Sequence, residues 1–222
     1  RHPPAPGRRP HRLLVEYDAQ VLLELPAQPV PERQRHHPAR RLPGDLAIWV
    51  FILAELMAFA VLFSAYAFTR LKNLELFNTM QLTLDRDAGA LNTLLLITGS
   101  WFVARAVAAI KADRRAASAD FLLAGIACGV GFLVVKYFEY SAKFAAGIGL
   151  DTNSFYMFYI SLTMFHALHV VMGMIILGYV WNKARQGGYT AQEHHGIETG
   201  ASYWHMVDLV WIILFPLVYV MR

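Results

Sequence analysis

Residues 46–68, LAIWVFILAELMAFAVLFSAYAF, decide the fold class. A run of about 20 predominantly apolar residues is long enough to cross the hydrocarbon core of a bilayer as a helix, and this run holds one charged residue, Glu55. Four more runs of comparable length follow, at residues 89–110, 121–140, 154–181 and 203–221. Lipid offers no partner for unpaired backbone groups, and the alternating pattern of a membrane β-strand is absent, so each run must be a helix. The sequence therefore predicts an all-α integral membrane bundle of five transmembrane helices.

The composition favours a membrane protein over a soluble domain. Of the 222 residues, 56% are hydrophobic and 16% are charged, against about 25% charged in ordinary soluble domains. The net charge of +4 requires no nucleic-acid partner, because Lys and Arg gather on one side of the predicted spans, as the positive-inside bias dictates. That side holds 13 of them, the other side holds five, and two lie within spans. We therefore expect the N-terminus in the cytoplasm, the C-terminus in the periplasm and no binding of nucleic acid.

Residues 1–43 differ from the rest of the chain. They are rich in Pro and Arg, a composition typical of disorder, and we predict a basic arm outside the membrane. A short surface-lying helix is an alternative for residues 13–25. The five-helix membrane domain then covers residues 44–222, with Asp45 as a candidate N-cap of the first span. Near its end, Pro216 is expected to kink the fifth span.

Glu55 is the sharpest polar feature of the first span. An ionisable side chain in the hydrocarbon costs about 2.5–3.5 kcal/mol on insertion scales, so it needs a partner or a function. One interpretation is that Glu55 handles protons or contacts a lipid headgroup. The other, which we favour, is a neutral, hydrogen-bonded carboxyl that fastens helices together.

Two histidines share one face of the fourth span. His166 and His169 stand at positions i and i+3, a spacing that places both side chains on the same stripe of a helix. Metal ligation is conceivable, but no Glu-x-x-His or His-Glu-x-x-His pattern accompanies them, and the single cysteine, Cys128, excludes a multi-cysteine site. We favour interhelical hydrogen bonding and predict no metal, no cofactor and no catalytic residue.

Further polar residues lie at the ends of the third and fifth spans. His205 and Asp208 follow Glu198 along nearly one helical face. The histidine and the aspartate can pair with each other or bind across to neighbouring helices, in either case as a structural lock. In the third span, a local ion pair between Lys136 and Glu139, or extension of the lysine towards the membrane surface, explains the charge.

Glycines in the third and fourth spans predict close helix contacts. Gly125 and Gly129 form a Gly-x-x-x-Gly pair, which lets two backbones approach each other, and Gly173 and Gly178 are expected to act in the same way. Cys128 is expected to be a small packing residue.

Several motifs resemble those of one family in their order along the chain. The two most specific are H-x-x-H-V-x-x-G at residues 166–173 and Y-W-H-x-V-D-x-V-W at residues 203–211. Together they resemble the cytochrome c oxidase subunit III family of haem-copper oxidases, over about residues 43–222. The chain lacks the first two of the seven helices that mitochondrial-type members have. It resembles the five-helix branch, and LPGDLAIWVFILAE at residues 42–55 looks most like homologues associated with nitric oxide reductase.

The resemblance implies which residues matter. The proton- or lipid-linked candidates that it assigns to this chain are Glu55, Glu139, His166, His169, Glu198, His205 and Asp208. For an accessory subunit of this kind, we expect the helices carrying Glu55, His166 and His205 to form a polar seam within the bundle, and its apolar outer surface to dock on a partner.

The function implied by the resemblance is that of an accessory subunit without haem or copper. Such a subunit packs against the haem-bearing catalytic subunit I of an oxidase or reductase, binds membrane phospholipids and supports proton uptake and stability, in a bacterial inner membrane. Two alternatives stay open. One is a stand-alone metalloprotein or enzyme that uses His166, His169 and His205. The other is a proton-coupled transporter that uses Glu55, or an assembly factor.

Overall fold

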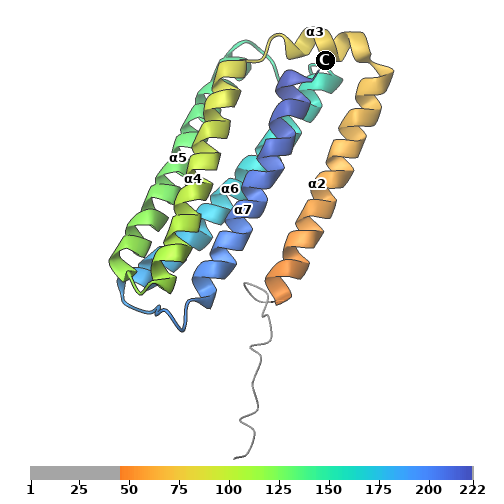
Figure 1. Ribbon diagram of the computed structural model, residues 1–222. Helices are drawn as coiled ribbons and strands as arrows, with labels where there is room; N and C mark the ends of the chain where they lie inside the picture. Colours follow the sequence, from red (N-terminus) through yellow and green to blue (C-terminus); the bar gives the residue numbers. More distant parts are fainter. Residues whose placement is uncertain (1–45, 222) are drawn as a thin grey trace, which may run out of the picture. The chain divides into compact units, whose positions relative to one another are not determined.

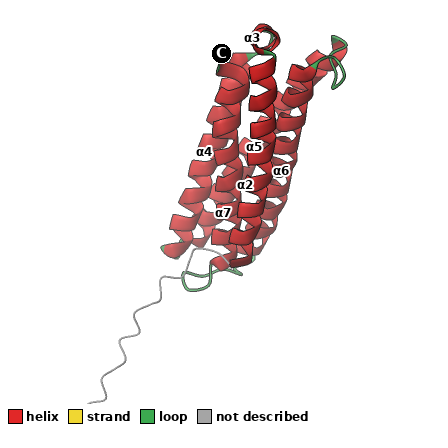
Figure 2. Ribbon diagram, turned by 90° about the vertical axis from the view of Figure 1, so that its right-hand side faces the viewer, coloured by secondary structure: helices red, strands yellow, loops and turns green. Residues whose placement is uncertain are grey.

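The structure, a computed structural model, describes residues 46–221. These residues form α2 (Leu46–Lys72), α3 (Leu74–Gln81), α4 (Arg86–Lys111), α5 (Arg115–Ala145), α6 (Ser154–Arg185), α7 (His195–Phe215) and the π-helical turn η1 (Pro216–Val220). Five of the helices are long and apolar enough to cross a membrane, the fifth being α7 continued by η1. They run side by side as one bundle, with α3 lying across one end (Figures 1 and 2). The all-α five-span prediction is confirmed.

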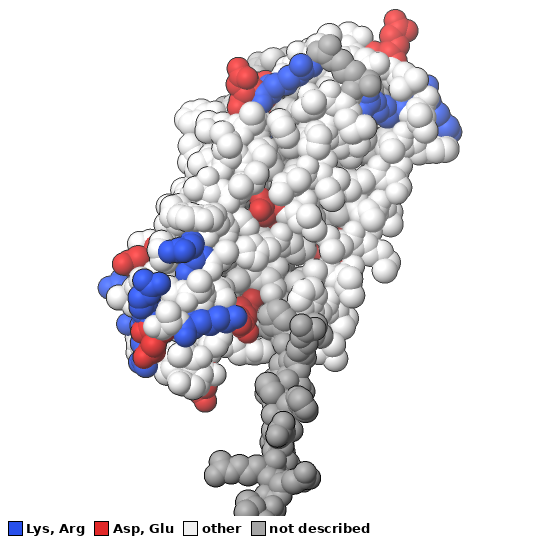
Figure 3. Space-filling model, in the orientation of Figure 1, with Lys and Arg blue, Asp and Glu red and all other residues white. Residues whose placement is uncertain are grey.

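The helices extend beyond the apolar runs at most of their ends. Hydropathy marks only the part of a helix that matches the hydrocarbon, whereas the helices continue into the polar interface. Two of their starts are fixed by side-chain caps: Asp85 accepts hydrogen bonds from the backbone of Asp87 and Ala88, and Asn153 accepts one from Tyr156. On the face seen in Figure 3, charged side chains gather at the two ends of the bundle and leave a nearly uncharged band between them. We call the end formed by residues 111–115 and 183–195 the basic end.

Helix α3 was not predicted from the sequence. It is eight residues long, too short to span, and it closes the end of the bundle opposite the basic end. Phe77 is fully buried between the rings of Tyr66 and Phe155, and the side-chain amide of Gln81 donates to the carbonyl oxygen of Val218 at 2.8 Å. These contacts tie the α2–α4 connection to the start of α6 and to the turn η1, which no pattern local to residues 74–81 could show.

Glycines and one tryptophan set the packing of α4, α5, α6 and α7. A Cβ on Gly125 would lie 2.9 Å from Val103 of α4, and a Cβ on Gly129 would lie 2.8 Å from the ring of Trp204 on α7. Gly173 of α6 faces the same ring, at 3.0 Å. Trp204 therefore fits into two glycine notches on neighbouring helices. The predicted close approach of two backbones is seen at Gly125, where a Cβ would lie 3.4 Å from the carbonyl oxygen of Gly99 on α4, whereas Gly129 and Gly173 make room for a side chain. For Gly178 that prediction is wrong, because a Cβ there would meet nothing within 4 Å.

The fifth span changes its winding at Pro216. The α-helix ends at Phe215, and residues 216–220 continue as a π-helical turn, because proline cannot donate the backbone hydrogen bond of a regular α-helix. The predicted disturbance at Pro216 thus takes the form of a wider turn. It leaves Val218 and Tyr219 fully buried, so the end of the chain packs into the bundle.

Helix α2 lies at the margin of the bundle. Its buried residues are Ile52, Phe59 and Tyr66, spaced seven apart as in a coiled-coil seam, and most of its other large apolar side chains are exposed. The arm at residues 1–43, the alternative helix at residues 13–25 and the cap at Asp45 lie outside the described residues.

Candidate functional site

Glu55 and His169 form a hydrogen-bonded pair between α2 and α6. The carboxyl Oε2 of Glu55 lies 2.9 Å from Nε2 of His169, and Nδ1 of the same ring lies 2.8 Å from the carbonyl oxygen of Phe165. A carbonyl oxygen only accepts, so Nδ1 carries a proton and donates. Nε2 then accepts from a protonated carboxyl, or it donates to a carboxylate as part of an imidazolium. In either form one proton lies between Glu55 and His169.

The pair sits at an apolar margin of the bundle. The ring of His169 meets the edges of Phe59 and Phe165, with centroids 5.1 and 4.6 Å away. Beside it, a groove of about 530 Å³ between α2 and α6 is lined by Ala58, Val61, Leu62, Ser161 and Phe165. The Glu55 and His169 side chains are partly exposed, so the shared proton lies close to the outer surface.

His166 faces a different neighbour. Its Nε2 donates to the carbonyl oxygen of Val207 on α7 at 3.0 Å, and its ring packs against Phe132 and Trp211. Its Nδ1 has no hydrogen-bond partner among the described residues. His166 and His169 therefore bind to different helices rather than converging on one ligand. Within residues 46–221 no group of three or more His, Cys, Asp or Glu side chains has a metal-binding arrangement.

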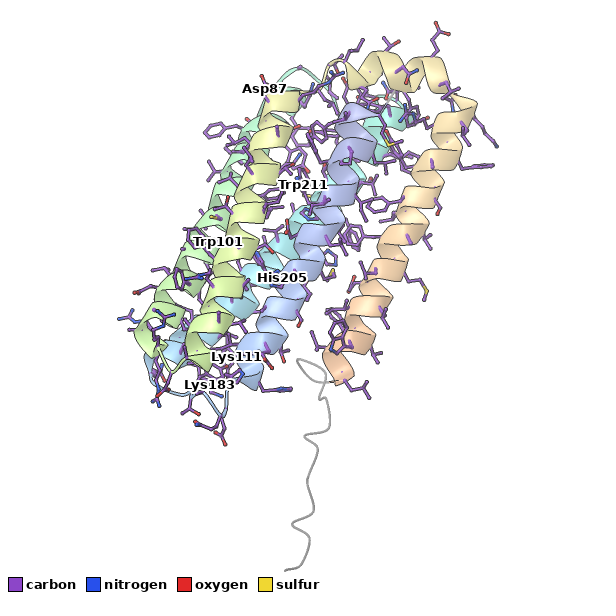
Figure 4. The ribbon with its side chains drawn as sticks, in the orientation of Figure 1. Asp87, Trp101, Lys111, Lys183, His205 and Trp211 are labelled. Carbon is purple, nitrogen blue, oxygen red and sulfur yellow. The ribbon has the colours of Figure 1, made fainter. Side chains whose placement is uncertain are left out.

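The polar residues of α7 contact α4. Nδ1 of His205 lies 2.6 Å from the hydroxyl of Ser100, and Nε1 of Trp211 donates to the hydroxyl of Thr93 at 2.9 Å. Figure 4 shows His205 near the middle of α7 and Trp211 nearer its C-terminal end. Of the two arrangements expected for His205, pairing with Asp208 is not formed and binding to a neighbouring helix is, through Ser100 of α4. Oδ1 of Asp208 has no hydrogen-bond partner among the described residues.

Glu198 belongs to the basic end of the bundle. Its Oε1 lies 2.7 Å from Nζ of Lys111 on α4 and 3.4 Å from Nε2 of His194. The contact joins α7 to α4, whereas the Glu55–His169 pair joins α2 to α6. The candidate residues thus lie in separate contacts between helix pairs, and a single continuous seam is not formed by the hydrogen bonds of the described residues.

Within residues 46–221, the most deeply buried charged side chain is Lys136, which belongs to a network on α5. Nζ of Lys136 donates to Oε2 of Glu139 at 2.9 Å and to the hydroxyl of Tyr219 at 2.6 Å. The hydroxyls of Tyr159 and Tyr219 both donate to Oε1 of Glu139, each at 2.7 Å. Lys136 is 1% exposed and Glu139 8%. The network ties α5 to α6 and to the π-helical turn.

The predicted ion pair is confirmed, but extension of Lys136 towards the surface is wrong. The ammonium is held inside by acceptors from α5 and the π-helical turn, and the ring of Trp211 lies 5.1 Å away. Lys136, Tyr159 and Tyr219 were missed as site residues. A signal existed: Lys136 continues the stripe Gly125, Gly129, Phe132 at helical spacing, and that stripe faces the core.

Comparison with known proteins identifies relatives of this chain. The family model described as Cytochrome c oxidase subunit III matches residues 34–222. The chain is 35% identical over 191 residues to a cytochrome c oxidase subunit 3 of Thermostichus vulcanus, an alignment that covers 86% of this chain and 92% of that protein. It is 34% identical over 186 residues to a cytochrome c oxidase subunit 3 of Synechocystis, covering 83% and 77%. A heme-copper oxidase subunit I+III of Aeropyrum pernix is 32% identical over 199 residues, covering 87% of this chain and 24% of the longer protein.

Proposed function

The chain belongs to the cytochrome c oxidase subunit III family, and on this premise we propose that it packs against the haem-bearing catalytic subunit I of a respiratory oxidase. It is a non-catalytic accessory subunit of a haem-copper oxidase, and a multi-pass protein of a bacterial inner membrane. The observation that best supports this association is the relative from Aeropyrum pernix, which is named as subunit I+III. The alignment with this chain covers 24% of that longer protein. A relative that unites both subunits supports their contact here.

Purification of the full chain in a mild detergent tests the association. A haem-bearing partner that elutes with it, recognised by its optical spectrum and by mass spectrometry, supports the proposal and identifies the terminal acceptor. A haem-free chain without that partner contradicts it. The relatives described above are oxidase subunits, so the resemblance to homologues associated with nitric oxide reductase stays a prediction, which the partner's identity also decides.

We further propose that Glu55 and His169 give the subunit its proton- and lipid-linked role. One proton lies between the two side chains, which are partly exposed and lie next to an apolar groove of about 530 Å³. A phospholipid acyl chain in that groove would lie on the same face of the bundle as the shared proton. The pair then acts as a site that releases its proton towards the outer surface and takes one back. The negative charge left after release is shared by two side chains that are partly exposed and hydrogen-bonded to each other.

Replacement of Glu55 by glutamine tests this role. The amide introduced at position 55 can still donate to Nε2 of His169, so we expect assembly to persist and the free energy of unfolding to change by less than about 0.5 kcal/mol. An amide cannot release a proton, so proton uptake during turnover of the assembled complex should fall. Proton uptake, turnover and bound lipid are the three quantities to measure.

The matched control is Glu75→Gln, at an exposed position on α3, which should leave all three quantities at the wild-type level. Equal proton uptake, turnover and lipid content for Glu55→Gln and wild type would reduce Glu55 to a structural carboxyl.

A further inference from the structure

A second groove lies at the basic end, on a different pair of helices. It has a volume of about 520 Å³ and is formed by the first turns of α5 and the last turn of α6. Its lining includes Arg115, Ala119, Asp120 and Leu123 from α5, with Trp181 and Arg185 from α6. None of these residues takes part in the contacts of Glu55 or in the Lys136–Glu139 network.

Two arginines give the groove its charge. Arg115 uses Nε to bind Asp113 at 3.1 Å, and its two terminal nitrogens have no acceptor among the described residues. Arg185 has no carboxylate partner in the described part of the chain, and its guanidinium lies over the ring of Trp181, 5.1 Å from the centroid. One carboxylate of the lining, Asp120, opposes them. The guanidinium groups thus offer several N–H donors, the arrangement that suits a phosphate oxygen.

The start of α5 adds to this charge. Its N-cap residue, Arg114, makes no side-chain capping bond, and no acidic residue occupies the first turn. The first N–H groups of a helix carry partial positive charge and attract anions when no side chain caps them. This contribution is secondary to the arginines, but it has the same sign and lies at the same mouth of the groove.

The groove changes polarity along its length. Arg115 and Arg185 lie at the outer turns, and Leu123, two turns further along α5, lies on the membrane side and is exposed. Trp181 lies between these levels, and tryptophan favours the headgroup region of a bilayer. A free phosphate ion would use only the arginine end. A phospholipid would place its phosphate at the arginines and an acyl chain along Leu123.

We propose that this α5–α6 groove binds an anionic phospholipid through its phosphodiester headgroup. Basic pockets between transmembrane helices attract acidic headgroups, and each basic residue near the surface contributes about fivefold to affinity. The proposal depends on the chain spanning a membrane. It requires neither the shared proton of Glu55 nor a particular catalytic partner. A result that contradicts the proposed function would therefore not contradict this lipid site, and the reverse also holds.

The test uses the full chain with its co-purified partner, after removal of bound lipid. The sample is titrated with phosphatidylglycerol or with phosphatidylcholine, and native mass spectrometry measures the number of bound lipid molecules. We expect tighter binding of phosphatidylglycerol, weakened about fivefold by Arg115→Gln or Arg185→Gln. Asp120→Asn should tighten it, a gain that misfolding could not produce. The matched control is Arg86→Gln, exposed at the opposite end of the bundle, which should change nothing.

Two further arms decide between occupants. Leu123→Trp should weaken phosphatidylglycerol binding because it fills the acyl end, and inorganic phosphate should compete poorly with the lipid. The proposal would be overturned by equal affinity for the two lipids, or by wild-type phosphatidylglycerol affinity in the Arg115→Gln/Arg185→Gln double variant. Competition by inorganic phosphate as strong as competition by lipid would overturn it as well. If the double variant loses the catalytic partner but still binds phosphatidylglycerol as wild type does, the proposal is also overturned. The groove would then be assigned to a contact with the partner protein.

Discussion

Lys136→Met should lower the free energy of unfolding by about 3–5 kcal/mol, the usual cost of removing one partner of a buried ion pair. The methionine fills much of the same space but leaves Glu139 with only the hydroxyls of Tyr159 and Tyr219, in a site that is 8% exposed. It also removes the bond from the ammonium to Tyr219, which holds the π-helical turn. Titration with sodium dodecyl sulfate in mild-detergent micelles measures the loss.

The double variant Lys136→Met/Glu139→Gln separates charge from packing. The glutamine at position 139 is neutral and its side-chain oxygen can still accept from the tyrosines, so most of the lost stability should return. Lys72→Met, at the exposed end of α2, is the control and should stay within about 0.5 kcal/mol of wild type. A Lys136→Met variant as stable as wild type would mean that the network contributes nothing to the fold.

Trp204→Ala is expected to cost a similar amount, about 3–5 kcal/mol. Trp204 is 1% exposed and its ring fills the notches left by Gly129 and Gly173. Its Nε1 makes no hydrogen bond within the described residues, so the variant removes packing alone. Helices in lipid associate through such packing rather than through transfer of apolar surface from water. The same detergent titration reports the change.

Trp101→Ala is the matched control for that experiment. Trp101 is 56% exposed and lies on the outer side of α4 (Figure 4), so its removal leaves no cavity and should have little effect on unfolding. A Trp204→Ala variant within about 1 kcal/mol of wild type would show that α7 can close the notch by relaxation. A small aromatic molecule such as indole should partly restore the stability of Trp204→Ala by occupying the cavity.

Side-chain partners were much harder to predict than spans. Glu55 was singled out as an acid that needs a partner, yet its partner, His169, stands 114 positions away in the chain. The histidine pair was correctly placed on one stripe of α6. The two side chains nevertheless point in slightly different directions around the helix axis, so that His166 binds α7 and His169 binds α2. His205 and Asp208, close in sequence, do not bind each other, since Ser100 of α4 competes for the histidine.

The sequence by itself determined the five spans, the family and the glycines that let helices approach. These features depend on length, hydropathy and short motifs, and lipid forces any such apolar run to satisfy its backbone internally. Only the tertiary structure decided that α3 closes one end, that Pro216 starts a π-helical turn and that Lys136 points inward. A buried charge can be placed only when its acceptors are known, and those of Lys136 come from α5 and from a turn 83 residues away.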